Sequence, residues 1–178
     1  MSGDLDGSAE QRLVSWGTAW NFSHDHPITG GSFDVLPNVD VFQRYQPRPL
    51  PGGFPSSGPH SIYFQLLADH GFPGLILFLF LIGSCLWSLW RVRRQAQHLL
   101  FASYLVDYAY MIEVSILGFM VSGAFLGFAY LDVIYEMVGL VVVIRMLLRH
   151  ELEANFVRLV DSNLERLAVA EEEVAIAG

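Results

Sequence analysis

The apolar residues of this chain gather in its middle, between a polar N-terminal stretch and an acidic C-terminal stretch. Residues 72–90 contain no charge, and a helix of these 19 residues just crosses a hydrocarbon core of about 30 Å. Apolar segments at about 108–129 and 133–148 predict two more spanning helices. The pattern therefore predicts an all-α integral membrane protein with three transmembrane helices between residues 72 and 148.

The positions of the arginines predict how these helices are oriented. Five arginines follow the first span or close the third: Arg91, Arg93, Arg94, Arg145 and Arg149. Because arginine beyond an apolar span marks the cytoplasmic side, we expect residues 1–71 outside the cytoplasm and residues 91–106 as a cytoplasmic link. Residues 149–178 hold seven acidic side chains against three arginines and keep apolar residues at helical spacing. They are expected to form an acidic, amphipathic cytoplasmic helix.

The extracytoplasmic region is expected to contain short helices and an irregular loop. One helix should begin at Ser8, a favourable N-cap residue, and end near residue 22. Residues 34–59 are rich in proline and glycine without a sustained period, which predicts a long irregular loop. A short helix over residues 61–70 should end at Gly71, because glycine suits the left-handed conformation that follows many helices.

Composition narrows the possible functions. A net charge of −8 with no basic stripe argues against nucleic-acid binding. The single cysteine, Cys85, excludes an internal disulfide and a thiolate metal cluster. The N-terminus is acidic and lacks the apolar core of a signal peptide, although residues 1–71 must be exported. We therefore expect that helices normally preceding Met1 are missing, and that the chain is a C-terminal fragment of a larger polytopic protein or an open reading frame that was begun at an internal methionine.

His60 is the first candidate for chemistry, because it opens a short helix at the expected membrane surface. A neutral imidazole next to a lipid headgroup could act as general base for an acceptor hydroxyl. The alternative is a helix-entry histidine bonded to the backbone. The sequence leaves open whether His60 would act as a base or as a positioning group.

Arg12 shares one helical face with Trp16 and Trp20, which follow it at intervals of four residues. A guanidinium forms paired, charge-assisted hydrogen bonds to phosphate and keeps its charge, which suits a pyrophosphate leaving group. The alternative is an exposed arginine lying over Trp16 through a cation–π contact. Arg44 and Arg48, in the irregular loop, are secondary phosphate candidates, and solvated loop charges are their alternative.

Other polar residues give weaker signals. His24 and His26 lie two residues apart with no third ligand at helical spacing, so we expect no metal site. Asp69, near the end of the short helix, is a candidate cap, orienting contact or catalytic group. Four carboxylates lie in or beside the second and third spans and should face a cavity or a partner: Asp107, Glu113, Asp132 and Glu136.

One set of motifs resembles a known family. Residues 60–74 read His-Ser-Ile-Tyr-Phe-Gln-Leu-Leu-Ala-Asp-His-Gly-Phe-Pro-Gly and run into the first span. Arg-Leu-Val-Ser-Trp at residues 12–16 and Pro-Ile-Thr-Gly-Gly-Ser-Phe at residues 27–33 precede them. Together, over residues 8–148, they resemble the C-terminal half of the O-antigen ligase and polymerase family. Within it, the chain is most similar to the O-glycosylation ligases that accompany exosortase systems.

The resemblance implies a polytopic glycosyltransferase of the bacterial inner membrane that works without a metal or other cofactor. It implies transfer of a glycan from an undecaprenyl pyrophosphate carrier to an acceptor hydroxyl of a lipid core, a glycan or a protein, with residues 1–71 in the periplasm. Arg12 matches the family's external phosphate-binding arginine, and His60 its essential histidine. Four further residues are expected to bind substrate: Trp16, Arg44, Arg48 and Asp69. Two positions depart from the commoner pattern, since Ser61 replaces an asparagine and Asp69 a glutamate.

Two other functions remain open from the sequence. A polymerase of the same class would join repeat units on the lipid carrier and would share the same motifs. A non-catalytic, truncated membrane scaffold would need none of the chemistry. A transporter is the weakest reading, since it rests only on the carboxylates in and beside the spans.

Overall fold

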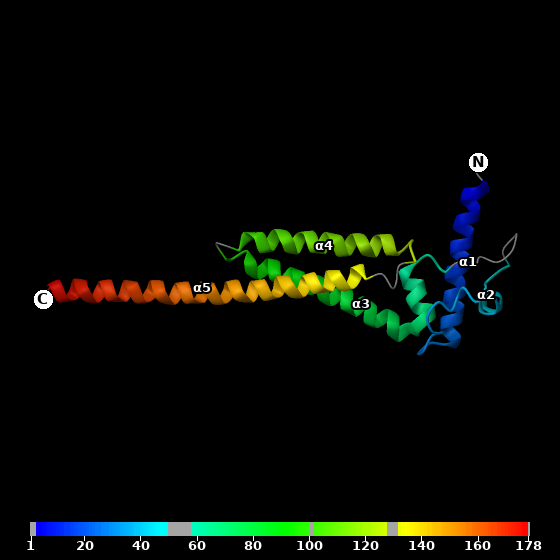
Figure 1. Ribbon diagram of the computed structural model, residues 1–178, viewed down its shortest axis with the longest axis horizontal. Helices are drawn as coiled ribbons and strands as arrows, with labels where there is room; N and C mark the ends of the chain where they lie inside the picture. Colours follow the sequence, from blue (N-terminus) through cyan, green and yellow to red (C-terminus); the bar gives the residue numbers. More distant parts are fainter. Residues whose placement is uncertain (1–2, 50–57, 100–101, 128–131, 178) are drawn as a thin grey trace. The chain divides into compact units, whose positions relative to one another are not determined.

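The computed structural model describes residues 3–49, 58–99, 102–127 and 132–177, and every regular element in this part of the chain is a helix. In chain order they are α1 (Gly3–Asp25), α2 (Val39–Tyr45), α3 (Ile62–Ala96), α4 (Ser103–Gly123) and α5 (Val133–Ala177) (Figure 1). The expectation of an all-α chain is confirmed for these residues. The helices divide into two compact units, which we describe separately. Unit 1 comprises residues 1–84 and 115–134, and unit 2 comprises residues 85–114 and 135–178.

Two of the described helices, α3 and α4, are long and apolar enough to cross a membrane. Only 22% of the most apolar window of α3, and 17% of that of α4, is buried inside the protein. Their apolar side chains therefore face outwards, as those of lipid-facing helices do. The third expected span, residues 133–148, lies in α5, which is not among the helices able to cross by length and composition. Two charges, Glu136 and Arg145, interrupt this segment, and Arg149 directly follows it.

The structure corrects several expected boundaries. α1 begins at Gly3, so Ser8 lies inside the helix and is not its N-cap. Residues 34–59 are not irregular throughout, because they contain α2; residues 50–57 of this loop lie outside the described part. The link between the first two spans is shorter than 91–106, since α3 continues to Ala96 and α4 begins at Ser103. The third apolar segment and the tail form one continuous helix, α5.

Helix α2 is too short to show a helical period in its sequence, but a capping residue defines where it begins. The side chain of Asn38 accepts hydrogen bonds from the backbone N–H groups of Asp40 (3.0 Å) and Val41 (3.5 Å). This is the N-cap arrangement that satisfies free donors in a first helical turn. The ring of Phe42 is then 1% exposed, which anchors α2 within unit 1.

The core of unit 1 lies where α1 crosses the first turns of α3. Its buried residues are Ala19, Phe22, Leu36 and Ala68. The hydroxyl of Ser23 donates to the carbonyls of Ala19 (2.6 Å) and Leu67 (3.2 Å), so the crossing is also joined by a hydrogen bond. Small side chains at the crossing let the two helices approach closely, which fixes α1 against the residues that follow His60.

Gly71 interrupts α3, as the sequence predicts. Its φ of 68° and ψ of −167° are not helical, and any Cβ there would lie 2.5 Å from the carbonyl oxygen of Pro27. The loop after α1 satisfies the backbone groups that this break frees. Gly31 N–H donates to the carbonyl of Ala68 (2.9 Å), and Phe72 N–H donates to Pro27 (2.9 Å). Glycine is required at position 71, because a side chain would meet both an unfavourable φ and a backbone atom.

The end of α4 packs against the start of α3 in unit 1. The hydroxyl of Tyr63 donates to the carbonyl of Met120 (2.9 Å), and Phe119 packs on the buried pair Ile62 and Leu66. A Cβ at Gly123 would lie 2.5 Å from the Ile62 side chain, so the chains approach closely there. Helices approach closely where a small residue lies between them, and Gly123 is such a residue.

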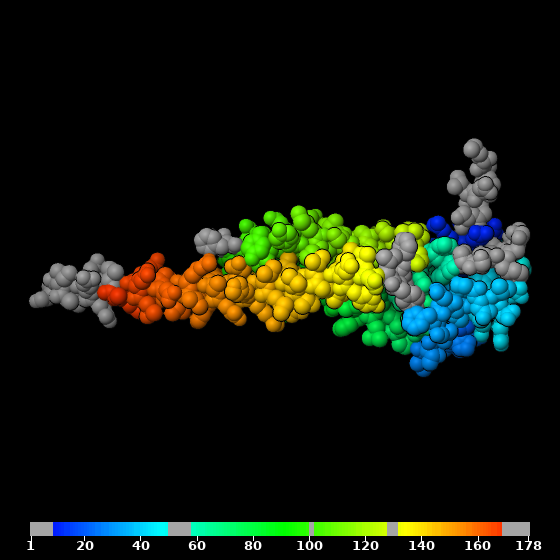
Figure 2. All heavy atoms as spheres, viewed as in Figure 1, coloured from blue at the N-terminus to red at the C-terminus, as the bar shows by residue number. Residues whose placement is uncertain are grey.

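In unit 2, α4 contacts both the end of α3 and α5. A guanidinium nitrogen of Arg93 lies 3.0 Å from a carboxylate oxygen of Glu113, and both side chains are about three-quarters buried. Glu113 thus has the partner expected of a carboxylate in an apolar helix. The hydroxyl of Tyr104 donates to Glu151 of α5 (2.9 Å). Beyond this contact α5 continues past the ends of α3 and α4, with mostly exposed side chains up to residue 168 (Figures 1 and 2).

Candidate functional site

The turn before α3 is tied to α1 by a tryptophan. The indole N–H of Trp16 donates to the carbonyl of Pro59 (2.7 Å), the residue directly before His60. The Trp16 ring also stacks on Phe64, with ring centres 5.2 Å apart and planes 12° from parallel. The carbonyl of Ser61 accepts from Gln65 N–H (2.9 Å), which starts the first turn of α3. His60 is therefore held on both sides by hydrogen bonds of its neighbours.

His60 itself has an unusual backbone and an exposed side chain. Its φ is 47°, in the left-handed region that residues other than glycine seldom adopt. Its imidazole is exposed, whereas Pro59 and Ser61 on either side are buried. A non-glycine residue is kept in this conformation only where its surroundings determine it, and such residues cluster at functional sites. The turn thus presents an accessible imidazole from a fixed backbone.

The segment that follows α4 forms another side of the site. The rings of Phe125 and Trp16 lie 6.4 Å apart. A Cβ at Gly127 would lie 3.6 Å from the Cα atom of His60 and 3.7 Å from the Oε1 atom of Gln65. Residues 125–127 therefore lie against the His60 turn, although more than sixty positions separate them in the sequence. Sequence motifs gave no signal for this contact.

Gln65 is a polar residue of the site that the sequence motifs did not indicate. Its amide nitrogen donates to the carboxylate of Asp34 at 3.4 Å. Its carbonyl oxygen, Oε1, is buried and has no hydrogen-bond partner among the residues that the structure describes. A buried acceptor without a donor is unfavourable, by about 1–3 kcal/mol. Gln65 therefore offers an unused acceptor beside His60.

Arg12 lies one helical turn before Trp16, on the same face of α1. The side chain is half-buried, and within the described ranges of the chain it forms no ion pair and no cation–π contact. The expected alternative, an arginine lying over Trp16, is therefore not seen there. The Trp16 bond places this face of α1 against the His60 turn, so Arg12 and His60 belong to adjoining segments of unit 1.

Among the described residues, no contact joins Arg44 or Arg48 to the His60 turn. Arg48 forms an ion pair with Glu10 (3.0 Å). Because residues two apart on a helix point to nearly opposite sides, Glu10 and Arg12 lie on different sides of α1. Arg44 lies in the last turn of α2, where its guanidinium is 5.7 Å from the centre of the adjacent Tyr45 ring. Both arginines lie in unit 1 and are exposed.

Asp69 lies deeper than the other candidates, with a relative exposure of 2%. Its carboxylate accepts from Val35 N–H (3.2 Å), and its carbonyl accepts from Ser32 N–H (3.1 Å). A Cβ on Gly30 would collide with the Asp69 backbone, so the loop passes directly over this residue. The orienting contact is thus present, since Asp69 holds the loop that leads to Asp34.

The residues His24, Asp25 and His26 each have partners within unit 1. His24 Nδ1 lies 2.9 Å from the carbonyl oxygen of Trp20, and the His26 ring lies 4.5 Å from that of Phe22. Burial raises the pKa of Tyr45, and a hydrogen bond to Asp25 raises it further, so the phenol stays protonated at neutral pH. Among the described residues, no three His, Cys, Asp or Glu side chains are grouped as metal ligands would be.

Comparison with known proteins gives a family match over the N-terminal part of the chain. The described residues form helices, two of which are able to cross a membrane, as is typical of helical membrane proteins. Residues 1–79 match the family model described as O-antigen ligase. The match spans Arg12, Trp16, His60 and Asp69. No curated protein and no solved structure matches the chain. The resemblance is confirmed over these residues, while the association with exosortase systems stays a prediction.

Proposed function

We propose that this chain acts in glycan transfer at the outer face of the bacterial inner membrane. The donor would be a glycan on undecaprenyl pyrophosphate, and the product a glycan joined to an acceptor hydroxyl. The O-antigen ligase match at residues 1–79 supports transfer of this kind, and α3 and α4 support a location in a membrane. One observation carries the proposal: the Trp16 hydrogen bond joins the helix of Arg12 to the exposed His60 turn, inside the matched residues.

In this proposal, the acceptor hydroxyl attacks the anomeric carbon of the donor sugar. A new carbon–oxygen bond forms, the bond to the pyrophosphate breaks, and the hydroxyl proton passes to the imidazole of His60. Negative charge grows on the leaving pyrophosphate as the bond breaks. Arg12 stabilises that charge, because a guanidinium offers two parallel donors and remains positive.

Other residues are proposed to orient the substrates. The unused Oε1 atom of Gln65 would accept a hydrogen bond from a sugar hydroxyl next to His60. Arg44 and Arg48 would attract the anionic carrier from the rim of unit 1, where both are exposed. Asp69 would act indirectly, by fixing the loop that carries Asp34.

The proposed reaction is tested by following labelled glycan in membranes from cells that express the chain from its own locus, compared with a deletion strain. We expect label on an acceptor other than the lipid carrier, and loss of that product in the deletion strain. Lengthening of chains still attached to the carrier would instead identify the polymerase reaction. An unchanged product pattern in the deletion strain would exclude both and leave the scaffold.

Replacing Trp16 by phenylalanine tests how the His60 turn is held. Phenylalanine keeps the aromatic stack on Phe64 but cannot donate to the carbonyl of Pro59. We expect transfer to fall about tenfold, the effect of about 1.4 kcal/mol in the barrier, while helical content and membrane insertion persist. The measurement is the initial rate of transfer at saturating donor.

Trp20→Phe is the matched control, since Trp20 lies one turn along α1 and is 48% exposed. Transfer by this variant should equal that of the wild type. Equal losses in the two variants would show a general effect on α1 and not a specific role of the Trp16 bond.

A further inference from the structure

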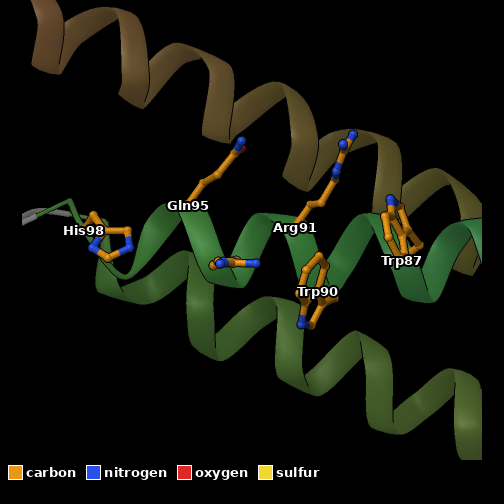
Figure 3. Close-up of a pocket in the computed structure, with 6 residues that line it drawn as sticks. Trp87, Trp90, Arg91, Gln95 and His98 are labelled. Atoms are coloured by element: carbon orange, nitrogen blue, oxygen red, sulfur yellow. The ribbon is translucent and has the colours of Figure 1, made fainter.

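The last turns of α3, in unit 2, carry side chains that the proposed reaction does not use. Five of them line a hollow of about 480 Å³ together with His98, which lies just beyond the helix: Trp87, Trp90, Arg91, Arg94 and Gln95. Figure 3 shows the labelled members following one another along the end of α3. Their positions repeat every three or four residues, so they share one side of the helix. We call this surface the α3 terminal face.

The other side of the same turns is already engaged. Leu89 and Val92 are buried, with relative exposures of 0% and 1%. Arg93 is paired with a carboxylate of α4 at 3.0 Å. By contrast, Arg91 and Arg94 are exposed and form no ion pair with any described residue. The α3 terminal face therefore presents two positive charges outwards, in a chain whose net charge is −8.

The tryptophans hold these charges in place without neutralising them. The guanidinium of Arg91 lies 5.8 Å from the centre of the Trp87 ring, and that of Arg94 lies 5.3 Å from Trp90. The two indole rings are themselves 5.3 Å apart. Because a cation–π contact leaves the N–H donors of arginine free, both guanidinium groups can still bind an anion.

The position of this face along α3 indicates the kind of anion. The uncharged run of α3 ends at Trp90, where a spanning helix leaves the hydrocarbon core. Tryptophan gathers at that level of a bilayer, and arginine next to it attracts anionic lipid headgroups. The exposed rings of Trp87 (58%) and Trp90 (41%) suit contact with lipid and not with a protein core.

We propose that the α3 terminal face binds the headgroup of an anionic phospholipid in the leaflet where α3 ends. Arg91 and Arg94 bind the phosphate, and Gln95 and His98 lie beside them to contact headgroup hydroxyls. The hollow lies within the range of about 300–1,000 Å³ that small-molecule sites occupy. This site lies in unit 2 and does not depend on the proposed glycan transfer.

The test is native mass spectrometry of the purified chain, titrated with phosphatidylglycerol or with phosphatidylcholine of the same acyl chains. We expect the wild type to retain phosphatidylglycerol more tightly. Each arginine near an anionic surface contributes about fivefold, so Arg91→Gln/Arg94→Gln should lower this preference about 25-fold. Equal retention of the two lipids by the wild type would overturn the proposal without any variant.

Two controls separate a specific lipid site from an effect of net charge and from binding of free phosphate. Arg158→Gln/Arg166→Gln makes the same change of net charge in the tail of α5 and should keep the preference, with helicity of all variants checked by circular dichroism. Equal losses in the two double variants would show an effect of net charge alone and overturn the site. Excess inorganic phosphate should not displace the lipid; full displacement would identify a site for soluble phosphate instead.

Discussion

His60→Ala is expected to lower glycan transfer by a factor of about 10²–10⁴, the usual contribution of a general base. The side chain is exposed, and the turn is held by the bonds of Pro59 and Ser61 to Trp16 and Gln65. Loss of the imidazole should therefore leave the turn and the membrane insertion intact. The measurement is the rate of labelled glycan transfer in membranes, with protein amount and carbonate-resistant insertion determined in the same samples.

A second substitution separates the two roles proposed for the histidine. His60→Gln keeps hydrogen-bonding groups but cannot take a proton at neutral pH, so a base predicts the same loss as in His60→Ala. A positioning group predicts that glutamine restores a large part of the rate. His24→Ala removes an exposed imidazole from the end of α1 and should have no effect. Normal transfer by His60→Ala would contradict the assignment of this residue.

Arg12→Ala is expected to lower transfer by a factor of about 10²–10³, because it removes the positive charge proposed to stabilise the leaving pyrophosphate. Arg12 is half-buried on α1 and pairs with no carboxylate of the described residues, so its loss should leave few contacts unsatisfied. The decrease should appear mainly in the maximal rate at saturating lipid-linked donor. Measuring the rate of transfer over a range of donor concentrations distinguishes a lower maximal rate, which indicates lost leaving-group stabilisation, from weaker donor binding.

The matched variants of Arg12 sharpen this expectation. Arg12→Lys keeps the charge but loses the paired donors of the guanidinium, so part of the rate should return. Arg149→Ala removes an exposed arginine from α5 in unit 2 and should leave transfer unchanged. An unaltered maximal rate in Arg12→Ala would show that this arginine has no part in the chemistry.

Features set by single residues were predictable from the sequence. The break in α3 follows from Gly71, since the chain needs a positive φ there and no side chain can be accommodated. The shared face of Arg12 and Trp16 follows from helical spacing alone. The apolar run after residue 71 marked α3 as a candidate span, because length and the absence of charge are sufficient criteria.

Features set by long-range contacts were not predictable. Helix α2 depends on the Asn38 cap and on one buried ring, that of Phe42. A helix with a single buried residue shows no period in its sequence. Gln65 looked like an ordinary helical residue until the structure placed its side chain beside Asp34 and the backbone of Gly127. Such proximity between distant segments arises from tertiary packing, which local propensity and spacing do not encode.

The same limit applies to charges in apolar helices. Glu113 could be assigned a partner only in general terms, because the pairing with Arg93 depends on how α3 and α4 pack in unit 2. The match of residues 1–79 to the O-antigen ligase family indicates a class of reaction, and the substitutions described above test the single side chains.

The central prediction is that the His60 region lies at the outer face of the membrane, because the proposed reaction uses lipid-linked glycans there. Cys85 is the only cysteine, so Cys85→Ala gives a background in which Thr29→Cys or Gln97→Cys supplies one exposed thiol. A maleimide that cannot cross membranes is then added to intact spheroplasts. We predict labelling of the Thr29→Cys variant and protection of the Gln97→Cys variant until the membrane is permeabilised. Protection of Thr29→Cys, with labelling of Gln97→Cys, would contradict the proposed orientation and with it the proposed function.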